Sequence, residues 1–141
     1  MKLETEIIIN TSSDIVWNHL MNFEQYPNWN PFIKFIQGNA VKGNSLVVKI
    51  HPPDSSVMTF KPLILKSEKN VEFRWLGHFG IPGLFDGEHS FTLFDQGNNT
   101  TLFKHEERFS GILVPLFKKT LKTKTQVGFE RMNHALKKLC E

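Results

Sequence analysis

The first thirty residues carry two patterns of apolar and polar positions. From Leu3 to Ile9 these positions alternate, which is typical of a β-strand with one buried face. From Ile15 to Met21 apolar residues recur at helical spacing, and either Ser12 or Ser13 can cap the start of that helix. The segment 23–32 contains two prolines, so a second helix there is expected to last only one or two turns.

The middle of the chain contains repeated strand-like runs with turn residues between them and no helical pattern. An antiparallel meander accounts for such an order. Together with the first strand it predicts about seven strands. The later strands are expected at 33–37, 45–51, 57–67, 71–79, 84–94 and 101–110.

The last thirty residues return to helical spacing. Apolar and small residues recur at steps of three and four from Phe117 to Leu139, and the lysines lie mostly off that stripe. Pro115 suits the first turn of this long amphipathic helix. Gly128 lies on the apolar stripe, where it indicates either space for a cavity or close packing of the helix on a strand.

These elements predict an α+β fold in a single domain spanning residues 1–141. The long helix and the sheet must bury their apolar faces on each other, so we expect a curved antiparallel sheet wrapped around the C-terminal helix. A strongly curved sheet does not meet a helix along its whole length. The sequence therefore predicts a gap between them.

Several local patterns carry a family resemblance. The segments 13–20 and 23–31, the latter with a Tyr-Pro-x-Trp-Asn turn, resemble two short helices after a first strand, and 73–77, 87–91 and 105–111 resemble late strands and the entry to a long helix. On these segments nearly the whole chain resembles the START/Bet v 1-like (SRPBCC) superfamily, including the polyketide cyclase/dehydrase-like helix-grip proteins. The resemblance implies a helix-grip fold with a cavity for an apolar or amphipathic small molecule. It implies no single chemistry, because the reactions vary among members.

Composition and charge narrow the function classes. Thirteen Phe and three Trp against one Tyr suit a dry interior. Segment 112–141 has seven basic and two acidic residues, while the rest of the chain has a net charge of −2. No aromatic residues are interleaved with the basic ones as a platform for bases, so we expect no nucleic-acid partner. The lysines between Lys118 and Lys124 fit a solvated helix face, with an anionic ligand or a membrane surface as the alternative.

The remaining sequence features favour a cytoplasmic protein without a cofactor. The single cysteine, Cys140, cannot form an intramolecular disulfide or a thiolate metal site. The N-terminus has no signal-peptide core, and no apolar run is long enough to cross a membrane, so no integral membrane contact is expected. Phosphate loops and hydrolase elbows do not occur, and we expect no metal site.

Strand parity and the helix stripe predict which side chains line the cavity. On each strand alternate residues share a face, so the apolar set should point toward the helix. The predicted ligand-binding residues are Trp75, His89, Phe91, Phe103, His105, Glu107, Phe109, Phe117, Leu121, Gly128 and Met132. Arg74 and Lys104 should lie on the opposite face.

Two histidines and one carboxylate are thereby expected among the inward aromatic side chains. His105 and Glu107, with His89 nearby, are candidates for general acid/base catalysis, because burial and a partner set the pKa of such groups. The same side chains can instead anchor the head group of a ligand. They can also form a hydrogen-bonded network with a purely structural role.

The leading functional hypothesis is a carrier that sequesters a small hydrophobic molecule with a polar end. A second hypothesis is an enzyme similar to the aromatase/cyclase members, and a third is a protein-interaction module that uses an open sheet edge or the basic helix. Between carrier and enzyme, we expect a carrier. The ligand should enter where the backbone is irregular, at 79–84, at 52–54 or at the start of the long helix, and we favour 79–84.

Overall fold

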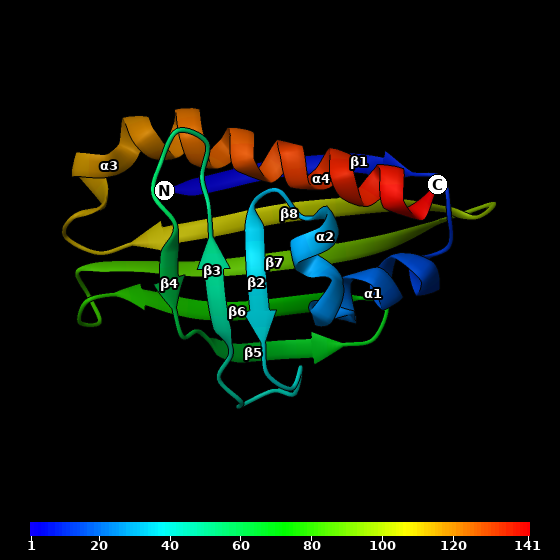
Figure 1. Cartoon of the computed structure of the whole chain (residues 1–141), viewed down its shortest axis with the longest axis horizontal. Helices are drawn as coiled ribbons and strands as arrows, with labels where there is room; N and C mark the ends of the chain where they lie inside the picture. Colours follow the sequence, from blue (N-terminus) through cyan, green and yellow to red (C-terminus); the bar gives the residue numbers. More distant parts are fainter.

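The chain folds into two antiparallel sheets beside a long C-terminal helix (Figure 1). This computed structural model describes residues 1–141. The strands are β1 (Lys2–Ile9), β2 (Ile33–Gln37), β3 (Val47–Ile50), β4 (Met58–Phe60), β5 (Leu63–Glu68), β6 (Glu72–Phe79), β7 (Phe85–Gly97) and β8 (Thr100–Ser110). The helical segments are α1 (Ser13–Met21), the 3-10 turn η1 (Phe23–Gln25), α2 (Tyr26–Trp29), α3 (Val114–Thr120), the π-helical η2 (Leu121–Thr125) and α4 (Gln126–Cys140). The predicted α+β class and the order of elements are confirmed.

The predicted single sheet is two sheets, of five strands in the order β1-β8-β7-β6-β5 and of three strands in the order β2-β3-β4. The predicted strand 57–67 is divided at Pro62, where β4 ends and β5 begins. Proline has no N–H to donate to a ladder, so the strand cannot continue through it. The chain therefore leaves the smaller sheet at this point and enters the larger one, and the number of strands rises to eight.

The two short helices after β1 close one end of the molecule (Figure 1). Ser12 caps α1 by accepting a hydrogen bond from the backbone N–H of Ile15 at 3.4 Å. Tyr26, at the start of α2, is fully buried and donates its hydroxyl hydrogen to the Leu20 carbonyl at 2.7 Å. The Tyr26 hydrogen bond joins α2 to α1.

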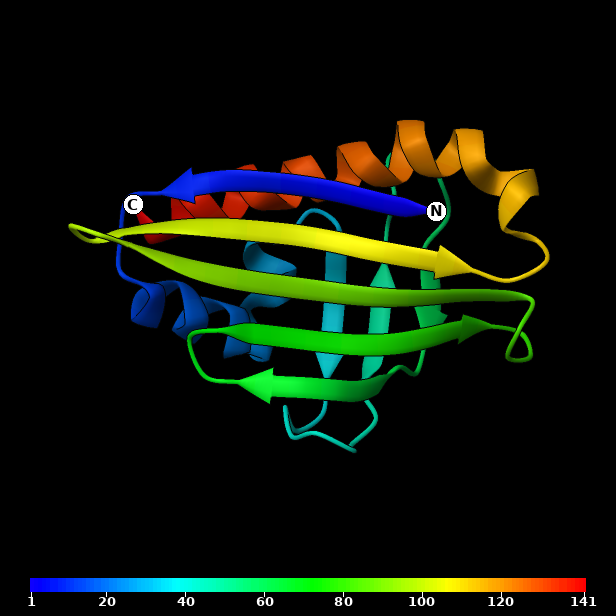
Figure 2. The same ribbon diagram turned by 180° about the vertical axis from the view of Figure 1, so that it is seen from behind.

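The C-terminal helix runs along the β1 edge of the larger sheet, as Figures 1 and 2 show from opposite sides. It begins at Val114 with Pro115 in its first turn, as predicted. The part named α4 packs against β1, β8, α1 and α2. A single turn of π-helix, η2, separates it from α3. No helix in the chain pairs enough length with enough apolar character to span a membrane.

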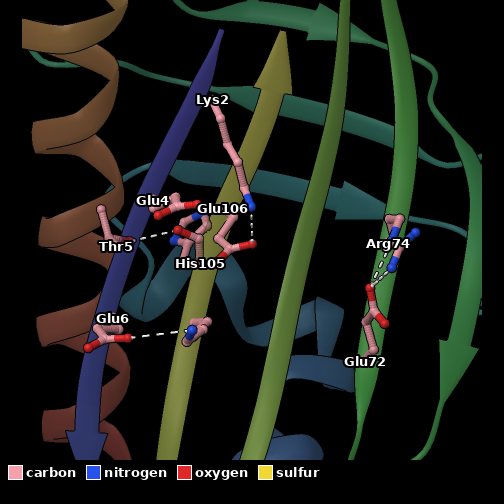
Figure 3. Close-up of polar contacts among 9 residues, drawn as sticks. Lys2, Glu4, Thr5, Glu6, Glu72, Arg74, His105 and Glu106 are labelled. Carbon is pink, nitrogen blue, oxygen red and sulfur yellow. Dashed lines mark hydrogen bonds and ion pairs between the residues drawn. The ribbon is translucent and has the colours of Figure 1, made fainter.

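Strand parity in the larger sheet agrees with the expectation from sequence. Phe73 and Trp75 are buried on the inner face. Arg74 lies on the outer face, where its Nε donates to Glu72 at 2.7 Å (Figure 3). No register shift interrupts the pairing of β6 with β7, so alternation holds along both strands.

Gly128 allows the C-terminal helix to pack closely on a neighbouring segment. Of the two alternatives considered for it, close packing is therefore the correct one. A Cβ atom built at this position would overlap the ring of Phe32, which is itself buried. The missing side chain therefore lets the chain after α2 approach the helix. It creates no cavity volume.

Candidate functional site

A pocket of about 460 Å³ lies at the end of the molecule where the C-terminal helix begins. Three parts of the fold enclose it. Strands β3 and β4 and the connection between them contribute Ile50, Pro52, Ser55, Ser56, Met58 and Phe60. The larger sheet contributes Gly77, His78, Phe79, Phe85, Gly87, Glu107 and Phe109. The helical segment contributes Leu113, Phe117, Thr120, Leu121 and Thr125.

Two glycines on the inner face of the larger sheet open this pocket. Gly77 and Gly87 are directly paired across β6 and β7, and Gly87 pairs in turn with Phe109 on β8. The next inward-facing row toward the core contains Trp75 and His89. Large side chains fill the space between sheet and helix in that row, whereas the glycine row leaves it open.

Glu107 is the only carboxylate in the pocket wall. Its side chain is 15% exposed, and its Oε1 lies 3.2 Å from His89 Nδ1. The two residues are directly opposite each other on β7 and β8. Glu107 thus joins the pocket to the buried interior of the sheet.

A chain of buried polar groups continues from His89 into the core. His89 Nε2 lies 2.8 Å from His105 Nε2, and His105 Nδ1 lies 2.9 Å from Asn133 Oδ1. Asn133 Nδ2 donates to Thr5 Oγ1 at 2.8 Å. Thr5 Oγ1 donates to the His105 carbonyl at 2.8 Å, a contact drawn in Figure 3.

Aromatic rings enclose both histidines. The ring of Phe129 stacks on His105 with centroids 4.0 Å apart, and Trp75 stacks on His89 with centroids 4.9 Å apart. Burial, together with the neighbouring His89, holds the pKa of His105 well below its usual range. His105 is therefore neutral at ordinary pH.

The predicted ligand-binding residues divide into two groups. Those in the pocket wall are Glu107, Phe109, Phe117 and Leu121. Those packed in the interior, away from the pocket wall, are Trp75, His89, Phe91, Phe103, His105, Gly128 and Met132. The expected single cavity lined by Trp75, His89, Phe91, His105 and Glu107 is therefore absent, because four of these five side chains pack on one another and on the helix.

Sequence reasoning omitted most of the pocket wall. The β3–β4 connection lies far along the chain from the other walls, and only its Pro-Pro-Asp turn at 52–54 was considered, as a point of entry. Gly77 and Gly87 lie on the predicted inner face of the sheet. The alternation along the strands could therefore have identified them as pocket residues. All three predicted entry segments border the pocket, through Pro52, Phe79 and Leu113.

The side chains of the pocket wall are suited to binding a ligand and to transferring a proton. No group of three or more His, Cys, Asp or Glu side chains converges in a way that could hold a metal ion. The remaining polar groups of the pocket wall are hydroxyls and His78, whose Nδ1 lies 2.6 Å from Asp86 Oδ1. Glu107 is thus the one carboxylate that a bound molecule can reach in the pocket.

Solved structures with the same fold cover almost the whole chain. A START superfamily protein from Mycobacterium smegmatis superposes with a TM-score of 0.74 at 18% identity, over 98% of each chain. The Zhui aromatase/cyclase from Streptomyces sp. R1128 gives a TM-score of 0.80 at 10% identity, over 99% of this chain and 93% of that one. Norcoclaurine synthase from Thalictrum flavum, in complex with dopamine and hydroxybenzaldehyde, gives a TM-score of 0.73 at 13% identity, over 99% of this chain and 85% of that one. Such low identities establish the fold alone.

The sequence itself identifies the family. No functionally curated protein matches it significantly. The model of a protein family described as polyketide cyclase / dehydrase and lipid transport matches residues 1–141. On that match and on its fold, the chain belongs to the polyketide cyclase/dehydrase and lipid transport family, within the START-like helix-grip superfamily.

Proposed function

We propose that this protein binds a small hydrophobic or amphipathic molecule in the pocket beneath α3, as a carrier or sequestering protein. The observation that carries the proposal is a pocket of about 460 Å³ whose wall contains one carboxylate, Glu107. Pockets for small molecules have this character, with mostly apolar walls and a few polar groups that fix orientation.

The apolar part of the ligand would lie against the aromatic side chains of the pocket wall. Phe85 packs edge-on against Phe117 with ring centroids 5.6 Å apart and also contacts Phe79 and Phe109. Burial of apolar ligand surface on such rings contributes about 25 cal/mol per Å². The polar end would then lie near Glu107, deeper in the sheet.

Four of the residues chosen from sequence would contact the ligand directly: Glu107, Phe109, Phe117 and Leu121. The packed residues behind them would act indirectly, by holding Glu107 in place. Trp75 and His105 belong to that second group, because each contacts His89 and His89 faces Glu107.

Entry is expected between the β6–β7 hairpin and the start of the helix. Two backbone hydrogen bonds join these segments, from Ile112 N to the Gly83 carbonyl at 3.1 Å and from Leu113 N to the Leu84 carbonyl at 2.9 Å. Ile81 and Leu116 are 66% and 77% exposed near this junction. Separating two hydrogen bonds would widen the pocket there without breaking the core.

A fluorescence titration with the neutral probe N-phenyl-1-naphthylamine tests this function. The wild-type protein should bind it saturably at one site. Leu121→Trp should reduce binding at least about tenfold, because the larger side chain fills the pocket that Leu121 lines. Leu139→Trp is the matched control, since Leu139 lies near the far end of the same helix and is 39% exposed.

Two results would contradict the proposal. One is a wild-type protein that takes up no probe and shows no copurifying small molecule by native mass spectrometry. The other is a folded Leu121→Trp variant with wild-type affinity, which would place the bound probe elsewhere.

The hydrogen bond between Glu107 and His89 supports a second candidate function, proton transfer to or from a bound substrate. A carboxyl group with a histidine partner at a pocket wall has the geometry of a general acid or base. Structures with this fold include an aromatase/cyclase and norcoclaurine synthase. If the protein is such an enzyme, Glu107→Gln should abolish turnover of a poly-β-keto substrate while binding remains.

A further inference from the structure

The polar chain that ends at Glu107 has a fixed direction of hydrogen bonding. Thr5 has one hydroxyl hydrogen, which it donates to the His105 carbonyl. Its Oγ1 therefore accepts from the amide nitrogen of Asn133, and the amide oxygen of Asn133 must face His105. An amide oxygen can only accept, so the Nδ1 of His105, 2.9 Å away, carries a hydrogen.

This direction of hydrogen bonding determines which nitrogen of His89 donates a hydrogen to His105. A neutral His105 with a hydrogen on Nδ1 has a free lone pair on Nε2. His89 Nε2, at 2.8 Å, must therefore carry a hydrogen and donate it. Only the Nδ1 of His89 is left to interact with Glu107.

One proton then lies between His89 Nδ1 and Glu107 Oε1, which are 3.2 Å apart. If it is on the nitrogen, an imidazolium faces a carboxylate. If it is on the oxygen, a carboxylic acid donates to a neutral imidazole. The net charge of the pair is zero in both forms.

The second oxygen of Glu107 is an acceptor in both forms. Oε2 lies beside Gly87, which has no side chain to cover it, and no protein group donates a hydrogen bond to it. It is a carboxylate oxygen in the first form and a carbonyl oxygen in the second. Glu107 therefore offers lone pairs, and no hydrogen, to the pocket.

From this geometry we infer that the pocket is selective for a neutral amphipathic molecule whose buried end is a hydroxyl group, an alcohol or a phenol, that donates to Glu107 Oε2. This inference rests on the proposed ligand-binding function and adds the chemical class of the ligand. A buried acceptor without a donor is costly, so an ether or a carboxylate is disfavoured. An ammonium group is also disfavoured, because a pair without net charge does not compensate for its desolvation.

Three probes with the same number of non-hydrogen atoms test the chemical class of the ligand. Decan-1-ol, 1-methoxynonane and decylamine, which is cationic at pH 7, are each used to displace N-phenyl-1-naphthylamine from the wild-type protein. Decan-1-ol should bind roughly tenfold more tightly than 1-methoxynonane, which is the effect of one buried hydrogen bond. Decylamine should bind more weakly than decan-1-ol.

Two substitutions at Glu107 separate its role as an acceptor from a role for its charge. In Glu107→Gln the amide N–H can donate to His89 and the amide oxygen can face the pocket, so the preference for the alcohol should persist. In Glu107→Leu the preference should disappear. Glu88→Leu is the matched control, because Glu88 lies on the opposite face of β7, outside the pocket wall, and should not affect the preference.

The outcomes are distinguishable. Equal affinities for the alcohol and the ether in the wild-type protein would overturn the inference and leave the proposed function standing. Tightest binding of decylamine, lost in Glu107→Gln, would also overturn it and indicate an ionised carboxylate as the anchor. Absence of any probe binding would contradict the proposed function itself.

Discussion

The carboxyl group of Glu107 occupies the space that a side chain at position 87 would fill. A Cβ atom built on Gly87 would overlap Glu107 Oε2 and come within 3.2 Å of its carboxyl carbon. His89 follows Gly87 by two residues on the same face and lies directly opposite Glu107. Any side chain at position 87 must therefore move the carboxyl group relative to His89.

Gly87→Ala should weaken binding of decan-1-ol and destabilise the fold by about 1–3 kcal/mol, the usual effect of overpacking a well-packed site. Displacement titration and chemical denaturation measure the two effects. Gly77→Ala is the matched control, since Gly77 pairs with Gly87 and the atoms nearest its Cβ would be in the side chains of Phe60 and Pro62. Equal losses of hydroxyl selectivity in both variants would show that the position of Glu107 is not the cause.

The buried, neutral His105 should make stability depend on pH below about 6.5, the usual histidine pKa. Its pKa is lowered in the folded state by burial and by His89, so the unfolded chain binds one more proton than the native protein in this range. The free energy of unfolding should therefore fall as the pH is lowered from 6.5 to 5, with a slope approaching about 1.4 kcal/mol per pH unit.

Urea denaturation at several pH values between 5 and 7 measures this slope. His105→Gln should be less stable at pH 7, but its stability should be nearly flat over this range. His134→Gln, at an exposed position on the same C-terminal helix that packs on His105, should keep the wild-type slope. A slope that survives in His105→Gln would assign it to another group.

Gly128→Ala should destabilise the protein even though alanine favours a helix over glycine by about 1 kcal/mol. The added methyl group would overlap the ring of Phe32, and overpacking costs about 1–3 kcal/mol. In a Phe32→Leu background the same substitution should cost less, a coupling that a double-mutant cycle measures by chemical denaturation. A stabilising Gly128→Ala in the wild-type background would contradict this contact.

Cys140 should react slowly with alkylating reagents. Burial, with a smaller effect of the neighbouring Glu141 carboxylate, raises the pKa of its thiol to about 11. Since the thiolate is the reactive form, alkylation by iodoacetamide at pH 8 should be at least roughly tenfold slower in the native protein than in urea. Equal rates in both conditions would indicate that the end of α4 is frayed.

The local order of elements could be predicted from the sequence because it depends on short-range periodicity. Alternation along single strands placed His89, His105 and Glu107 on the inner face, and the structure agrees on that face. The starts of the helices at Ser12 and Pro115 were likewise local features. Pro62, also visible in the sequence, divides a strand, but which sheet each half would join depends on residues elsewhere in the chain.

The position of the pocket was decided only by tertiary structure. Parity assigns a side chain to a face of the sheet, but not to the filled or the open part of that face. Trp75 and His89 pack against each other, whereas the row of Gly77 and Gly87 one step along the strands leaves space. A pocket exists where side chains from distant segments fail to fill the volume between them, and this depends on how the β3–β4 connection and α3 close over the sheet.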